Sequence, residues 1–364
     1  MDKNVARENN IMIKGLKNLL PGLVHQRNIN LQLRYFSIKN HQNTETQPQM
    51  EKEQGKDYFG FQGQAENYQK YRPQYPKEFV DKVLSEETLP SLKKREICID
   101  IGTGTGLLAK HFAGLFTKVI GTDLSEAQLK QAAESHKDIP NLEFKQLDVK
   151  HLPEFLKEQS LDSGQVDLFT IGQALHWFED IDGTLQAVNS VLREDSYFTV
   201  FAYTIPRIND GSDWQKVMSD KMAPKGYDVV DAPALSGYTF VKDPTIHGKM
   251  AAAYNGMWDK IYKHFRFNRS VIEDFYQPFH FAENAKVLRR LIWFDVQTDR
   301  SPQAVLGYLE SVSAYRCYLE DYGIAKGSEE DPLEQVKRVF EEVGNPKVDF
   351  VTPYFAIALG KKTE

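Results

Sequence analysis

The feature that most constrains the fold is the stretch from Ile97 to Lys110, which reads I-C-I-D-I-G-T-G-T-G-L-L-A-K. Its apolar start predicts a buried strand, and the residues after the glycines follow helical spacing. Gly102, Gly104 and Gly106 allow backbone dihedrals that a Cβ forbids, or let a ligand lie directly against the main chain. The helix that follows presents free N–H groups, which favour a carboxylate or phosphate. The stretch therefore predicts a strand, turn and helix that cradle a nucleotide cofactor.

Neighbouring residues narrow the choice of nucleotide. The dinucleotide fingerprint G-x-G-x-x-G/A requires a small residue at position 107, where this chain has Leu107, so an NAD-dependent dehydrogenase is disfavoured. Asp100 stands two places before the first glycine, and the resulting D-x-G-x-G-x-G pattern resembles that of class I S-adenosylmethionine (AdoMet) dependent methyltransferases. Asp123 ends the next apolar run, where a carboxylate could accept hydrogen bonds from both ribose hydroxyls. The cofactor expected from this pattern is S-adenosyl-L-methionine.

Composition argues against several other classes of protein. The chain of 364 residues is 41% hydrophobic and 26% charged, and it lacks an apolar run of the ~18 residues that a membrane helix needs. A net charge of −6 argues against a nucleic-acid partner, which normally requires a basic surface. Cys98 and Cys317 are the only cysteines, too few for a disulfide framework or a metal cluster. No metal site is expected, and the oligomeric state stays open.

The amino-terminal segment has the composition of a targeting sequence. Residues 1–36 contain six basic side chains and two acidic ones, with apolar residues at partly helical spacing until Pro21. The run Arg34, Tyr35, Phe36, Ser37 resembles a presequence cleavage site. These features predict a mitochondrial presequence and a location in the matrix, while a disordered basic tail on a cytoplasmic protein stays open. Residues 37–57 have almost nothing to bury and predict a flexible linker.

A family resemblance begins in the segment before the first strand. Residues 61–76 read F-Q-G-Q-A-E-N-Y-Q-K-Y-R-P-Q-Y-P, and Pro73 and Pro76 predict a rigid elbow. This Y-x-x-x-R-P-x-Y-P arrangement, followed by the glycine loop, resembles the trans-aconitate methyltransferase-like branch of the AdoMet-dependent methyltransferases. The resemblance implies that the elbow folds over the cofactor and that Tyr68 and Arg72 line the active site. A simple cover for an edge of the sheet stays open as the alternative.

The resemblance continues through the later strands. Residues 142–148 predict a strand that ends at Asp148, a residue placed to meet the adenine amino group. Residues 166–178 predict a buried strand ending in G-Q-A-L-H-W-F, as the fourth strand of the family does, and residues 197–203 predict a fifth. We therefore expect an α/β fold with a Rossmann-like, seven-stranded class I methyltransferase sheet, helices on both faces and a helical cap insertion.

The expected domain organisation places the methyltransferase core at residues 58–205 and its completion at 331–364. The latter contains a helix at 332–343 and a closing pair of antiparallel strands at 347–361. Residues 206–330 are rich in aromatic side chains at mostly helical spacing and predict a cap over the strand ends. Within it, residues 307–316 read G-Y-L-E-S-V-S-A-Y-R and resemble the T-W-S-x-Y region of the family. Ser311 and Val312 replace the threonine and tryptophan, which indicates a different substrate.

The expected chemistry is a one-step displacement in which the protein aligns the reacting atoms. A carboxylate acceptor, as in the named relatives, needs no base and would be held by arginines, whereas a phenol or carbon acceptor would need a general base such as His176. Both kinds of small-molecule methyl acceptor stay open. A non-catalytic AdoMet-binding accessory or assembly protein in mitochondria stays open too, because cofactor binding alone would preserve the same motifs.

The residues expected at the site fall into three groups. Those with a catalytic role are His176 and Arg72. Those that bind the cofactor are Tyr68, Asp100, Gly102, Thr103, Gly104, Gly106, Asp123, Leu124, Asp148, Val149 and Gln173. Those that contact the acceptor are Trp177, Arg289, Arg290, Tyr315 and Arg316.

Overall fold

The computed structural model describes residues 71–161, 164–211, 214–230 and 243–363. The predicted presequence (1–36), the predicted linker (37–57) and Tyr68 lie outside the described residues. The domain boundaries at 58, 206 and 331 stay predictions. Within the described part of the chain, no helix is both long and apolar enough to cross a membrane.

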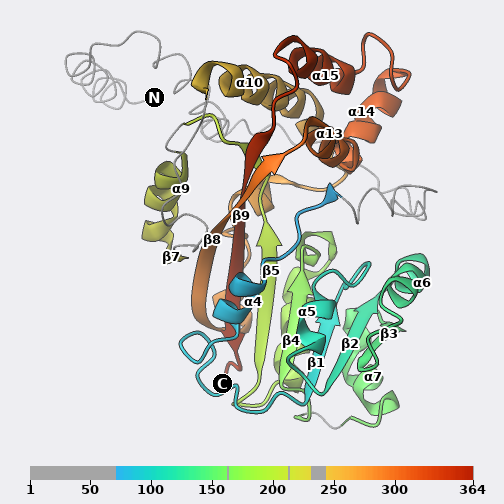
Figure 1. Cartoon of the computed structure of the whole chain (residues 1–364). Helices are drawn as coiled ribbons and strands as arrows, with labels where there is room; N and C mark the ends of the chain where they lie inside the picture. Colours follow the sequence, from blue (N-terminus) through green and yellow to red (C-terminus); the bar gives the residue numbers. More distant parts are fainter. Residues whose placement is uncertain (1–70, 162–163, 212–213, 231–242, 364) are drawn as a thin grey trace, which may run out of the picture. The chain divides into compact units, whose positions relative to one another are not determined.

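A single mixed sheet organises the fold (Figure 1). The strand order is β3-β2-β1-β4-β5-β9-β8-β7, and the short strand β6 also pairs with β9. The first five strands in this order are parallel, so their carboxyl ends lie at one edge of the sheet. The strands of this parallel part are β1 (Ile97–Ile101), β2 (Lys118–Asp123), β3 (Leu142–Gln146), β4 (Leu168–Gly172) and β5 (Tyr197–Tyr203).

The antiparallel part of the sheet differs from the sequence prediction. Strand β9 (Val348–Gly360) pairs antiparallel with β5 on one side and with the long β8 (Lys286–Arg300) on the other. The sheet therefore has nine strands rather than seven. The closing antiparallel pair consists of β8 and β9, and not of two strands within residues 347–361. The other two strands are β6 (Arg207–Ile208) and β7 (Asp228–Val230).

Strand β8 lies in the segment 206–330 that we expected to be mostly helical, and residues 286–300 depart from that expectation. The local sequence K-V-L-R-R-L-I-W-F-D-V-Q-T-D-R is rich in β-branched and aromatic residues, and β9 provides a partner along almost its whole length. Trp293 consequently belongs to the sheet core, where its ring lies 6.0 Å from that of Phe79. Phe79 also contacts Phe201 of β5, with 5.8 Å between ring centroids.

Helices cover the parallel part of the sheet. Helix α6 begins after Ser125, whose side chain accepts a hydrogen bond from the backbone N–H of Gln128. Helix α5 packs against β2 and β3, and α7 packs against α8. The elements of this region are α4 (Lys77–Val83), α5 (Ala109–Ala113), α6 (Glu126–Ser135), η1 (Val149–His151), α7 (Leu152–Glu158), η2 (Leu175–Trp177) and α8 (Ile181–Val191).

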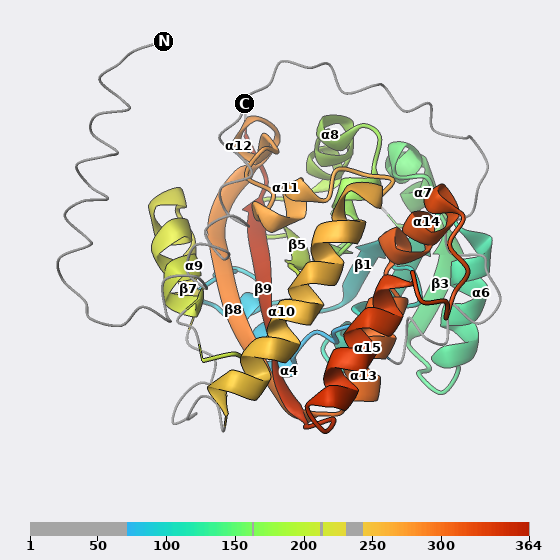
Figure 2. The same ribbon diagram turned by 90° about the horizontal axis from the view of Figure 1, so that it is seen from above.

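A second group of helices gathers beyond the end of the sheet toward which β5 points (Figures 1 and 2). Helix α10 packs against α14 and α15, and α13 also packs against α15, so the last helix joins the group that we expected to form a cap. The helices of this group are α10 (Pro244–Ile261), η5 (Tyr262–His264), α13 (Pro302–Glu310), α14 (Ser313–Tyr322) and α15 (Pro332–Glu342). The other helices of the later chain are α9 (Trp214–Met222), η3 (Ala223–Lys225), α11 (Ser270–Glu273) and α12 (Phe281–Asn284), of which α12 packs against α8 and β8 instead.

The elbow contacts this helical group directly. Arg72 Nη2 donates a hydrogen bond to the Ser311 carbonyl oxygen at 3.0 Å, and the Arg72 guanidinium lies 5.8 Å from the centre of the Tyr308 ring. The Tyr71 ring lies against Gly307 at the start of the same segment. Two segments that carry the family resemblance therefore meet in space, although they are more than 200 residues apart in the sequence.

Candidate functional site

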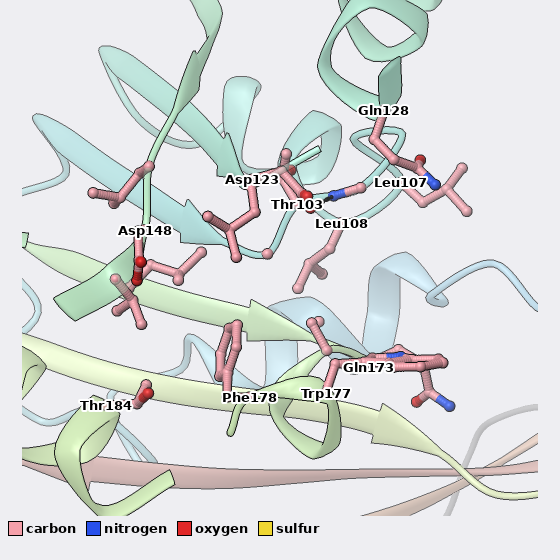
Figure 3. A pocket seen from close by; sticks show the side chains of 18 of the residues that line it. Thr103, Leu107, Leu108, Asp123, Gln128, Asp148, Gln173, Trp177, Phe178 and Thr184 are labelled. Carbon is pink, nitrogen blue, oxygen red and sulfur yellow. Dashed lines mark hydrogen bonds between the residues drawn. The ribbon is translucent and has the colours of Figure 1, made fainter. Parts of the chain in front are cut away.

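A cavity of ≈ 590 Å³ opens at the carboxyl ends of β1, β2 and β4 (Figure 3). Thr103 and Asp123 lie on one side of it, and Trp177, Phe178 and Thr184 lie on the opposite side. Of the predicted site residues, those that line the cavity are Gly102, Thr103, Gly104, Asp123, Leu124, Asp148, Val149, Gln173 and Trp177. Placement at this edge follows from the parallel strands, because their ends converge there.

The glycine loop leaves one face of its backbone bare toward the cavity. Gly104 has φ +55°, and a Cβ there would meet only Gln128 Oε1, at 3.8 Å. Gly106 has φ +79° and faces the protein instead, where a Cβ would lie 2.8 Å from His136 Cδ2 and 2.9 Å from Phe144 Cζ. His136 Nε2 donates to the Thr105 carbonyl oxygen at 3.0 Å and so stabilises the turn on the side that faces the protein interior. A ligand could therefore lie against the main chain at Gly104 but not at Gly106, which does not line the cavity.

We expect Gly106→Ala to destabilise the fold by roughly 2 to 4 kcal/mol, because a Cβ at positive φ is strained and this one would also displace the His136 and Phe144 rings. The free energy of unfolding from urea titration measures the loss. Gly114→Ala is the matched control, since Gly114 has φ −78° and nothing lies within 4 Å of an added Cβ. Equal stability of the two variants would contradict the strained geometry of the loop.

Asp100 supports the loop from inside the protein and does not line the cavity, contrary to its predicted cofactor contact. Its carboxylate accepts hydrogen bonds from Thr170 Oγ1 at 2.6 Å and Thr103 Oγ1 at 2.7 Å. Burial raises the pKa of Asp100 from 3.8 to about 6, although these two hydroxyl groups oppose the shift. Asp100 therefore acts on the cavity through Thr103, whose side-chain hydroxyl it holds.

Asp123 joins the loop to the end of β2. Its Oδ2 accepts a hydrogen bond from the Gly104 N–H at 2.9 Å, and its Oδ1 accepts one from the Ser125 N–H at 2.9 Å. A carboxylate offers about four acceptor positions in all, two on each oxygen. Leu124 follows with 60% of its surface exposed, and it gives the same wall an apolar face.

Asp148 and Val149 form another part of the wall, between β3 and α7. The Asp148 side chain accepts a hydrogen bond from the Lys150 N–H at 3.3 Å and pairs with the Lys150 ammonium at 2.6 Å. Burial opposes ionisation, but both contacts with Lys150 outweigh it and lower the pKa of Asp148. The residue therefore presents a carboxylate, and not a carboxylic acid, at neutral pH.

The end of β4 is fixed by Gln173. Its side-chain amide donates to the Tyr203 carbonyl oxygen at 3.2 Å, and its Oε1 accepts from the Tyr203 N–H at 2.9 Å. Gln173 has φ +54°, so the chain turns sharply after β4 and presents the next residues to the cavity. Because its side-chain amide is hydrogen-bonded to the backbone of β5, Gln173 contributes to the cavity mainly as part of its wall.

His176 lies beside Trp177 but outside the cavity lining, so its position does not support the role of general base that a phenol or carbon acceptor would require. Its Nδ1 shares a hydrogen bond of 2.8 Å with the Tyr276 hydroxyl, and its ring lies 4.5 Å from that of Phe267. Burial, followed by the positive charge of Arg269, holds the pKa of His176 well below its usual range. A neutral imidazole bonded to a tyrosine at this place contributes to packing and positions the neighbouring Trp177.

The structure also removes most of the predicted acceptor contacts from the cavity. Arg289 forms ion pairs with Glu87 and Asp228 at 2.6 and 2.7 Å. The Arg290 guanidinium lies over the Tyr227 and Phe281 rings. Both belong to β8, which is separated from β5 by β9, and neither lines the cavity.

Tyr315, Arg316 and Arg72 also lie outside the cavity lining. The Tyr315 hydroxyl is buried and donates to Asp331 Oδ2 at 2.8 Å, so it links α14 to the start of α15. Arg316 lies 3.6 Å from Glu320 on the same helix. Arg72 is directed at Ser311, although its neighbour Pro73 does line the cavity. None of these three side chains lines the cavity, and their predicted catalytic and acceptor roles stay predictions.

Several cavity residues escaped the sequence analysis. Phe178 is the last residue of the quoted G-Q-A-L-H-W-F run, so its signal was present but unused. Thr184 and Ala187 carry no local signal, because only the packing of α8 brings them to the cavity. The other unpredicted lining residues are Pro73, Tyr75, Ile101, Thr105, Leu107, Leu108, Gln128, Leu147, Lys150, Gly172, Ala174, Glu179, Asp180, Gly183 and Tyr203. In the ranges that the structure describes, no group of three His, Cys, Asp or Glu side chains could hold a metal ion.

Comparisons with known proteins concern mainly this part of the chain. Residues 99–198, which include the glycine loop, Asp123 and Asp148, match the family model described as "Methyltransferase domain". A Saccharomyces cerevisiae protein named as a probable S-adenosylmethionine-dependent methyltransferase is 29% identical over 147 residues, which cover 40% of this chain and 48% of the relative. A malonyl-[acyl-carrier protein] O-methyltransferase of Magnetococcus marinus is 28% identical over 135 residues, 36% of this chain and 46% of the relative.

The curated relatives match over part of their length only, since this chain spans about half of each. A solved structure from Anaeromyxobacter dehalogenans, described as a type II methyltransferase, resembles the fold with a TM-score of 0.54. The alignment covers 80% of this chain and 98% of that chain at 21% identity, which supports the Rossmann-like α/β fold. Assignment to the trans-aconitate branch stays a prediction.

Proposed function

We infer that this chain is a class I, S-adenosylmethionine-dependent methyltransferase, and we propose that it methylates a carboxylate oxygen of a small molecule. The observation that carries the inference is the cavity at the carboxyl ends of β1, β2 and β4. It is lined by the glycine loop, Asp123 and Asp148, and all of these lie within the matched methyltransferase domain.

The residues of the cavity fit the expected cofactor. Gly104 offers a bare backbone face, against which the amino acid part of the cofactor could lie. Asp123 places a carboxylate, the acceptor that ribose hydroxyls require, in the cavity wall at the end of β2, and the exposed Leu124 beside it offers an apolar surface for a base. Asp148 presents a carboxylate that could accept a hydrogen bond from the adenine amino group. When bound, the cofactor supplies a methyl group that is already activated for displacement.

The contribution of the protein to such a reaction is alignment and exclusion of water. The paired hydrogen bonds between Gln173 and Tyr203 fix the end of β4, and the ring contact of 4.3 Å between Trp177 and Phe267 closes the wall beyond it. These contacts are rigid elements of the scaffold, so they can hold an acceptor without further rearrangement.

A carboxylate acceptor is favoured because the general base expected from the sequence is poorly placed for that role. His176 is outside the cavity lining, its Nδ1 is bonded to Tyr276, and its pKa is strongly lowered. A carboxylate is ionised at neutral pH and attacks without loss of a proton. Its oxygen would form the new bond to the methyl carbon while the bond to sulfur breaks and sulfur keeps the electron pair. The name of the malonyl O-methyltransferase relative and the family resemblance support the same choice.

Two measurements test this proposal. We expect the full chain to bind S-adenosylhomocysteine in isothermal titration calorimetry, with a dissociation constant on the order of micromolar. We also expect it to transfer a labelled methyl group to at least one acid among trans-aconitate, malonate and octanoate, giving a product that mild alkali cleaves as an ester. Absence of cofactor binding would overturn the inferred class. Cofactor binding with labelling only of amines or phenols would overturn the carboxylate acceptor.

We further propose that the protein works in the mitochondrial matrix, on the basis of the composition of residues 1–36. Amino-terminal sequencing of the protein from isolated mitochondria should find a start near Ser37. An intact Met1, or absence from the organelle, would contradict the proposal.

The alternative of a non-catalytic accessory protein is not favoured.

A further inference from the structure

Arg269 is a buried cation with an unused hydrogen-bond donor. It directly precedes α11, and only 5% of its surface is exposed. Its Nε donates to Glu273 Oε1 at 3.1 Å, whereas its Nη2 is buried without a hydrogen-bond partner in the part of the chain that the structure describes. Buried guanidinium groups normally satisfy their donors, so a missing partner at this atom calls for an explanation.

The described residues around Arg269 include a carboxylate, aromatic rings and a second arginine. Its guanidinium lies 5.4 Å from the centre of the Phe265 ring. Burial opposes its charge, but Glu273 and the tyrosines Tyr308 and Tyr203 outweigh it and raise the pKa of Arg269. The positive charge of Arg72 is near enough to lower the pKa of Arg269. Two arginines and one glutamate therefore share an interior lined by aromatic rings.

This interior adjoins the cavity described above. Tyr203 contributes to the raised pKa of Arg269, and it also lines that cavity. Arg269 in turn lowers the pKa of His176, which directly precedes Trp177 of the cavity wall. Phe267, two residues before Arg269, contacts Trp177 with 4.3 Å between ring centroids. The segment that carries Arg269 thus packs on the wall of the cavity opposite the glycine loop, on the side of the predicted acceptor.

We propose that Arg269 is the specificity-determining residue that binds a carboxylate of the methyl acceptor through Nη2, with Arg72 adding a second positive charge nearby. The proposal rests on the function proposed above and replaces Arg289, Arg290 and Arg316 as the acceptor arginines. A guanidinium suits this role because it stays charged when buried and offers planar donors that match a carboxylate. Glu273 orients the guanidinium through Nε and leaves Nη2 directed elsewhere.

The test compares an acid with its neutral ester on the full chain saturated with S-adenosylhomocysteine. Trans-aconitate and malonate are the probes, and trans-aconitate trimethyl ester is the neutral analogue. We expect Arg269→Gln to weaken binding of the acid by at least about tenfold, the loss of one charge-assisted hydrogen bond, while cofactor affinity changes less than about twofold. Arg269→Lys should recover part of the acid affinity, because it restores the charge.

Arg266→Gln is the matched control. Arg266 lies on the same segment, its side chain is 27% exposed, and it pairs with Asp321. It should bind the acids as the unchanged protein does. Equal acid binding by Arg269→Gln, equal preference for the ester, or a saturated protein that binds neither acid would overturn the role of Arg269. Failure to bind S-adenosylhomocysteine at all would instead overturn the proposed function. If Arg269→Gln does not fold, the acid-to-ester preference of Arg269→Lys decides the question.

Discussion

We expect Asp123→Ala to weaken S-adenosylhomocysteine binding by tenfold or more, on the order of 1.4 kcal/mol. The substitution removes the proposed acceptor of the ribose hydroxyls. It also leaves the N–H groups of Gly104 and Ser125 without the carboxylate that holds them at 2.9 Å, so the loop loses its fixed form. Isothermal titration of the full chain measures the change.

Two further variants separate these causes. Asp123→Asn keeps one acceptor oxygen and should fall between the unchanged protein and Asp123→Ala. Glu126→Ala is the matched control, because Glu126 is an exposed acid at the start of α6, three residues away. It should leave the affinity unchanged. Affinity retained in Asp123→Ala would remove Asp123 from the cofactor site and leave the loop without its proposed ribose contact.

The second large effect concerns Asp100 and the pH dependence of stability. Burial raises the pKa of its carboxyl from 3.8 to about 6, so the folded protein holds this proton more tightly than the unfolded chain does. The protonated form therefore favours folding, and its contribution is lost as pH rises between about 4 and 6. A shift of this size corresponds to roughly 3 kcal/mol. Asp100→Asn carries no such proton and should not show this loss.

The measurement is the free energy of unfolding by urea at several pH values for both proteins. We expect the unchanged protein to lose stability relative to Asp100→Asn as pH rises from 4 to 7. The relative loss in the free energy of unfolding should approach roughly 3 kcal/mol. Thr170→Val serves as a second comparison, because it removes one of the two donors to the carboxylate and should raise the pKa of Asp100 further. A stability difference that stays constant with pH would show that Asp100 titrates normally.

Much of the cofactor side of the site could be predicted from short segments. Strand β1 runs over Ile97–Ile101 and strand β5 over Tyr197–Tyr203, as the apolar runs predict. Both strands are buried on both faces, so their composition is unambiguous. The glycine loop and Asp123 reach the same cavity because they follow adjacent parallel strands, β1 and β2. Nothing beyond local pattern and parallel pairing is needed to bring them together.

The acceptor side shows where this kind of reasoning stops. Residues 286–300 contain charged positions and no clear alternation over their whole length. Their strand character depends on β9, whose paired residues lie 48 to 74 positions later in the chain (348 − 300 and 360 − 286). Arg289 and Arg290 were natural candidates until that pairing placed them beyond β9. Arg269 gave no signal, because a single arginine in an aromatic segment is indistinguishable from a surface residue until its burial is known.

The sequence by itself therefore determined the fold of the parallel sheet, the cofactor cradle and the carboxylates beside it. These depend on contiguous patterns whose geometry is set by strand period, glycine dihedrals and the direction of the chain. Only the tertiary structure decided that Arg269 is buried while Arg289 and Arg290 lie on β8, and that His176 is bonded to Tyr276 instead of facing the cavity. The physical reason is that the burial and partners of these side chains arise from contacts between segments 100 or more residues apart, which no local pattern records.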